Sequence, residues 1–87
     1  MSQAEDAHAA VSAAVEQNEA TTGEVTAAKS AVESLVNELV NRLGDGGETV
    51  GYGQSAIEAL ESSMTALSAA GESLSSAQEA LAAMSNG

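Results

Sequence analysis

The sequence predicts an all-α protein folded as an antiparallel two-helix hairpin, and three observations lead to this prediction. Aliphatic residues recur at spacings of three and four in two long segments, as they do along one face of a helix. The chain has no proline to interrupt a helix, and it has only one aromatic residue, a class that favours strands. Five of its eight glycines lie between Leu43 and Ser55, where the backbone is expected to turn.

The predicted domain is one helical hairpin over residues 1–87, because a chain of this length supports one domain at most. We expect a first helix at about 4–43, a glycine-rich hinge at 44–54 and a second helix at about 55–85. The first segment carries a row at intervals of seven residues and a second row four residues further on. The first row is Val11, Asn18, Val25, Val32 and Leu39; the second is Val15, Thr22, Lys29, Val36 and Leu43.

A possible interruption of the first helix lies at Gly23. Thr21 and Glu24 have the spacing of a capping box, so a break near residue 22 is one alternative. The row at intervals of seven keeps its phase across the glycine. We therefore expect one helix, weakened or kinked at Gly23.

The second segment has a more regular stripe and a clearer start. Ser55 and Glu58 form a capping box directly after the glycine-rich stretch, which predicts that the helix begins there. Its leucine row is Leu60, Leu67, Leu74 and Leu81, with Ile57, Met64, Gly71 and Gln78 three residues earlier in each case.

The two stripes also predict a register. One antiparallel alignment places all four leucines of the second segment opposite the first row. The expected pairs are Leu39 with Leu60, Val32 with Leu67, Val25 with Leu74 and Asn18 with Leu81. The same alignment forms a polar layer from Asn18, Thr21 and Gln78.

The apolar material is too sparse for a self-sufficient hairpin. Half of the 38 hydrophobic residues are alanine, and their burial roughly balances the conformational entropy lost on folding. We expect the hairpin to pair with a protein partner, as a homo-oligomer or a hetero-oligomer, and so to form a four-helix bundle. The apolar residues beside the main rows are the candidate partner-binding residues: Leu35, Val40 and Met84.

The net charge of −11 excludes some partners. Thirteen acidic residues oppose only Lys29 and Arg42, so we expect neither nucleic-acid binding nor attraction to anionic membranes. The longest apolar runs fall far short of the ~20 residues that span a bilayer, so no membrane insertion is expected. The N-terminal residues lack the pattern of a cleaved signal peptide, which predicts a cytoplasmic protein or one exported without such a signal.

Residues with catalytic potential are few, and we expect no enzyme activity, no cofactor and no metal site. The chain has no cysteine, and His8 is its only histidine. No histidine lies near the serine-rich second segment to activate a nucleophile. The glycine-rich hinge lacks the lysine of a phosphate-binding loop, and Asp45 with Glu48 does not have calcium-loop spacing.

Tyr52, the single aromatic residue, has two interpretations. In the first interpretation, its ring packs on Leu43 or Ile57 and covers the apolar seam at the closed end of the hairpin. Alternatively, it is an exposed recognition element, and we include it among the candidate partner-binding residues.

The chain resembles the WXG100 (ESAT-6-like) superfamily of small type VII secretion proteins. Like these, it is just under a hundred residues long and free of cysteine, with a glycine-plus-aromatic turn between two long helices. The family turn carries Trp-x-Gly, where this chain has Tyr52 followed directly by Gly53. The family's export signal, a tyrosine four residues before an acid after the second helix, is absent. The resemblance implies a four-helix bundle and an adaptor that travels with, or chaperones, a partner that has the signal.

Three functional hypotheses follow from these observations. The first is an accessory interaction module of the WXG100-like kind. The second is a structural helical subunit of a phage or other large assembly. The third is an acidic regulator that masks a basic surface of its partner.

Overall fold

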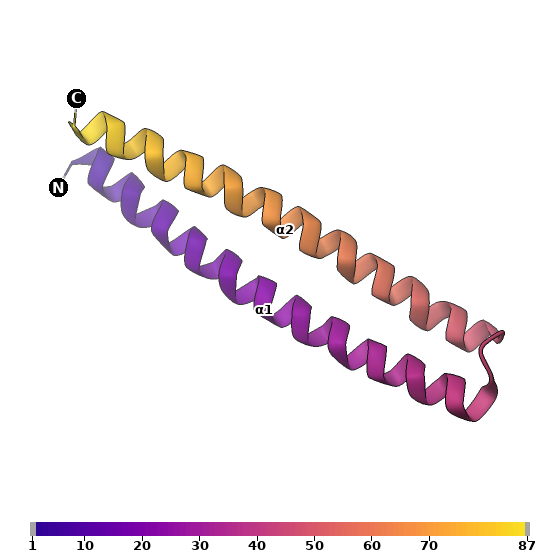
Figure 1. Cartoon of the computed structure of the whole chain (residues 1–87). Helices are drawn as coiled ribbons and strands as arrows, with labels where there is room; N and C mark the ends of the chain where they lie inside the picture. The colour runs from indigo at the N-terminus through magenta and orange to yellow at the C-terminus, as the bar shows by residue number, and fades with distance from the viewer. Residues whose placement is uncertain (1, 87) are drawn as a thin grey trace. The chain divides into compact units, whose positions relative to one another are not determined.

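The computed structural model describes residues 2–86 and, for Ser85 and Asn86, the backbone alone. Two long helices, α1 (Gln3–Leu43) and α2 (Glu48–Asn86), make up almost the whole of this range, and residues 2–86 contain no strand. The helices pack against each other as an antiparallel pair joined by a short loop (Figure 1). The predicted all-α hairpin is confirmed.

The chain divides into two compact units, each made from one segment of each helix. The loop unit comprises Gly23–Thr65 and therefore contains the loop itself. The end unit combines the described residues up to Thr22 with those from Ala66 onward. Each unit has its own contacts between α1 and α2 and is described separately below.

Helix α1 begins at a cap that was not among the predicted ones and continues through Gly23. The Oγ of Ser2 accepts a hydrogen bond from the backbone N–H of Glu5 at 3.1 Å, which satisfies one of the unpaired donors of the first turn. Of the two alternatives at Gly23, the continuous helix is the one found. A Cβ atom on Gly23 would meet nothing within 4 Å, so this glycine does not serve a close contact.

Gly44 ends α1. Its φ of +85° lies in the left-handed region, which glycine adopts without steric cost. Its N–H donates to the carbonyl of Val40 at 2.9 Å, which is the arrangement of a left-handed helix cap. Residues 45–47 complete the loop.

The predicted start of the second helix at Ser55 and the predicted hinge over 44–54 are wrong. Helix α2 begins at Glu48, so Tyr52 and its neighbouring glycines are helical. The predicted hinge is too long because glycine disfavours helix by roughly 1 kcal/mol at each position relative to alanine. Tertiary packing at Val50 and Gly53 overrides this preference.

The core of the loop unit forms where the start of α2 meets the last turns of α1. Val50 is 1% exposed and Val36 is 8% exposed, and these two are the only buried residues among those whose side chains are described. Gly53 faces Val36, and a Cβ atom on Gly53 would lie 2.6 Å from the Cγ2 of Val36. Gly53 therefore allows α2 to approach α1 closely.

The predicted register is wrong in both units. In the end unit Asn18 faces Gly71 instead of Leu81, because a Cβ atom on Gly71 would lie 3.3 Å from the Oδ1 of Asn18. In the loop unit Val36 faces Gly53, whereas the predicted alignment would place it opposite Ser63. Both differences amount to ten residues along α2, and they follow from the short loop, which brings earlier residues of α2 opposite α1.

Candidate interaction surface

The residues predicted to bind a partner are mostly exposed. Leu35 is 51% exposed, and Tyr52 and Met84 are each 69% exposed, which are high values for large apolar side chains. Val40 is half-buried. Leu43, a predicted member of the seam, is 63% exposed, because it is the last residue of α1 and loop residues follow it.

These residues do not gather into one surface. Leu35, Val40 and Tyr52 belong to the loop unit, whereas Met84 belongs to the end unit. Within α1, Leu35 and Val40 are five positions apart, which separates their directions by about 140° around the helix axis. Val36 lies between these two directions, so Leu35 and Val40 flank the seam on opposite sides.

Of the two interpretations of Tyr52, the structure supports the exposed one. Its hydroxyl donates a hydrogen bond to the Oε1 of Glu48 at 3.1 Å, one helical turn earlier on the same helix. Tyr52 is 69% exposed, so its ring is not buried in the seam as Val50 is. Val50 fills the core position at the closed end instead.

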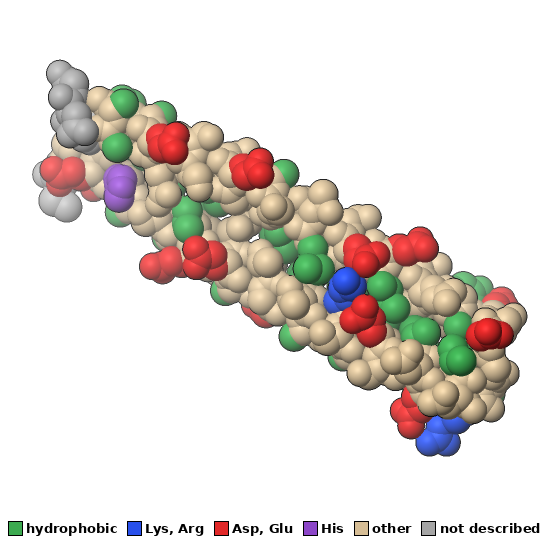
Figure 2. All heavy atoms as spheres, viewed as in Figure 1, with side chains coloured by type: hydrophobic (Ala, Val, Ile, Leu, Met, Phe, Trp, Pro, Cys, Tyr) green, Lys and Arg blue, Asp and Glu red, His purple; other side chains and the backbone are tan. Residues whose placement is uncertain are grey.

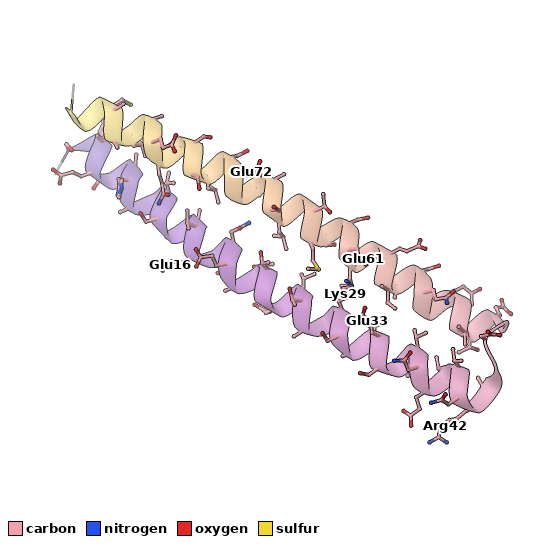
Figure 3. All side chains as sticks on the ribbon, viewed as in Figure 1. Glu16, Lys29, Glu33, Arg42, Glu61 and Glu72 are labelled. Carbon is pink, nitrogen blue, oxygen red and sulfur yellow. The ribbon has the colours of Figure 1, made fainter. Side chains whose placement is uncertain are left out.

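Both basic side chains lie in the loop unit, and each forms an ion pair. The Nζ of Lys29 is 3.1 Å from Glu61 of α2, and the Arg42 guanidinium is 3.1 Å from Glu38 on the same helix. Figure 3 shows Lys29 and Glu61 turned toward each other, with Glu33 on the same side. On the face seen in Figure 2, acidic side chains spread along both helices, and hydrophobic side chains reach the surface between them near the loop.

The end unit contains a polar contact between its two helices. The Nδ2 of Asn18 donates to the backbone carbonyl of Leu67 at 3.2 Å, and the hydroxyl of Thr22 donates to the carbonyl of Asn18 at 2.8 Å. Gly71 leaves room for the Asn18 amide. The predicted layer of Asn18, Thr21 and Gln78 is therefore replaced by a bond from Asn18 to the backbone of α2, and Thr21 accepts a hydrogen bond from Gln17.

Among the described residues 2–86, no three histidine, aspartate or glutamate side chains converge on a position that a metal ion could occupy, and no pocket opens on their surface. Within the described residues, neither α1 nor α2 contains a stretch apolar enough to span a membrane.

No protein-family model, no curated protein and no solved structure matches this chain.

Proposed function

We propose that this chain is a small, acidic, non-catalytic interaction protein, whose helical hairpin acts as an accessory, adaptor or export partner in a WXG100-like system. The observation that carries the proposal is the distribution of apolar surface. Val36 and Val50 alone are buried among the described side chains, whereas Leu35, Leu43, Tyr52 and Met84 are each more than half exposed.

Such a hairpin has little internal stabilisation. Each fully buried valine or leucine contributes about 1.5–3 kcal/mol, but most members of the two stripes are only partly buried. Small helical domains with so thin a core are usually completed by a partner that covers the remaining apolar surface. A second pair of helices would do this by forming a four-helix bundle.

The WXG100-like part of the proposal rests on the resemblance and on the hairpin. Two long antiparallel helices with a glycine-rich turn are what that resemblance implies. The role that the resemblance implies is that of an adaptor, a protein that travels with, or chaperones, a partner.

The experiment that tests the interaction role uses the whole chain. Sedimentation at micromolar concentration is combined with thermal melting across a hundredfold dilution, because an oligomer melts lower on dilution by mass action. We expect either a concentration-dependent oligomer or a broad, low-temperature transition of an incompletely stabilised hairpin. Leu35→Glu should weaken any assembly more than Ser62→Glu, which places the same charge at an exposed polar position.

A self-sufficient monomer would contradict the proposed interaction role. A sharply melting monomer, indifferent to dilution and to Leu35→Glu, would show that the hairpin is self-sufficient and needs no partner. A pull-down from the native cell with mass spectrometry would then be expected to recover no specific protein.

A further inference from the structure

The two faces of the loop unit differ in chemistry around the contact between Val36 and Gly53. Leu35 directly precedes Val36, and Tyr52 directly precedes Gly53. Successive residues of an α-helix point about 100° apart around the helix axis. Viewed along the direction of its own helix, each of these two side chains is therefore rotated by about 100° from the contact, and both in the same sense. In an antiparallel pair, equal turns to the same hand point to the same face, which places Leu35 and Tyr52 on one side of the unit.

The residues that directly follow the contact pair show the opposite face. Asn37 follows Val36 and Gln54 follows Gly53, and each turns by about 100° to the other hand. All four of these flanking residues are exposed. Directly beside the contact, one face of the unit thus presents a leucine and a tyrosine, and the other presents two amides.

The ion pair across the helices agrees with this assignment. By the same geometry, Lys29 and Glu61 are rotated from the contact direction by about 20° and 80°, both toward the face with the two amides. Their charged groups lie 3.1 Å apart, as expected for side chains on one face. Small side chains continue the apolar face beyond Leu35 and Tyr52, and all of them are exposed. They are Ala28 on α1 and Ala56 and Ala59 on α2.

The rim of this apolar face carries more acid than base. By the same geometry Glu24 and Arg42 each lie within about 20° of the direction of Leu35, and the charge of Arg42 is offset by its ion pair with Glu38. The Glu48 carboxylate is bonded to the Tyr52 hydroxyl. The loop unit as a whole carries seven acidic residues against Lys29 and Arg42. A second copy would bring an equal negative charge to the face, which disfavours self-pairing through like-charge repulsion.

We infer that the Leu35–Tyr52 face docks a helix from a different protein, one with an apolar stripe flanked by lysine or arginine. The apolar stripe covers Leu35 and Tyr52, the alanines allow close approach, and the flanking cations meet the acidic rim. This inference rests on the proposed interaction function and specifies the chemistry of its partner.

Three synthetic helical peptides without aromatic residues serve as probes. One has a leucine stripe flanked by lysines, the second has glutamates in place of the lysines, and the third keeps the lysines but scrambles the leucines. Binding is measured by the rise in melting temperature and by the near-ultraviolet signal of Tyr52, the only aromatic residue of the chain. We expect the first peptide to bind at least about tenfold more tightly than either of the others.

Matched variants locate the site. Leu35→Ser and Tyr52→Ser should each weaken binding of the first peptide by about tenfold, whereas Asn37→Ser and Gln54→Ser should change it less than about twofold. All four positions are exposed, so the variants are expected to retain the helical circular dichroism of the parent protein.

Several outcomes would overturn the inference. Equal effects of the variants on the two faces, or equal binding of the scrambled peptide, would show attraction by net charge alone. Self-association that is lost in Leu35→Ser would identify a second copy as the occupant and would leave the interaction function standing. A stable monomer that binds none of the peptides would contradict both proposals.

Discussion

Gly53 of α2 faces Val36 of α1 so closely that a Cβ atom on the glycine would lie 2.6 Å from the valine Cγ2. No real side chain tolerates this distance without a shift of one helix or of the Val36 side chain. Val36 is one of two buried residues among the described side chains, so a shift would disturb the core directly.

Gly53→Ala is therefore expected to destabilise the protein by about 1–3 kcal/mol, as overpacking does in other cores. The control is Gly51→Ala, two residues earlier in the same helix, where an added Cβ meets nothing within 4 Å. The control should stabilise by up to about 1 kcal/mol, because alanine favours helix over glycine. Urea titrations at one protein concentration measure both, and a stabilising Gly53→Ala would refute the close approach.

Val50→Ala should be the more costly of two matched valine truncations. Val50 is 1% exposed, and loss of its methyl groups removes buried apolar surface worth about 1–3 kcal/mol. Val40 is half-buried, so Val40→Ala should cost less than about 1 kcal/mol. Equal unfolding free energies for the two variants would mean that the start of α2 does not form the core.

Asn18→Asp tests the polar contact of the end unit. The amide donates to the carbonyl of Leu67 at 3.2 Å, and a carboxylate cannot donate, so two oxygens would face each other. We expect a loss of about 1–3 kcal/mol at neutral pH. Gln17→Glu makes the same chemical change at an exposed neighbour and should stay within about 0.5 kcal/mol. If both variants unfold at the same urea concentration, the bond from Asn18 contributes nothing.

The ion pair of Lys29 with Glu61 should contribute little to stability and should depend on salt. The side chains are 25% and 54% exposed, so solvent screens their attraction, and we expect a coupling of about 0.2–1 kcal/mol. A double-mutant cycle with Lys29→Met and Glu61→Gln measures it at low and high sodium chloride concentration.

The pair of Arg42 with Glu38 provides the comparison for this cycle. Its side chains are 72% and 62% exposed, so its coupling should be the smaller of the two. A Lys29–Glu61 coupling that exceeds this range or is unchanged by salt would show that the pair is more shielded from solvent than the structure indicates.

The sequence by itself determined the two helices and the reversal between them. The period of the apolar residues in each segment and the absence of proline predict long helices, and the glycines after Leu43 predict the turn. It also contained a signal for the start of α1, since Ser2 and Glu5 have capping-box spacing. These features are local, because they depend on residues a few positions apart.

The tertiary structure alone decided the length of the loop, the register and the exposure of Tyr52. Repeats at intervals of seven residues match one another in several alignments, so periodicity cannot select the one that places Gly53 against Val36 and Gly71 against Asn18. Those contacts select it, because small residues must lie where the helices approach most closely. Glycines that disfavour helix locally are accepted at the start of α2 since Val50 becomes buried there, and this rotates Tyr52 to the outside.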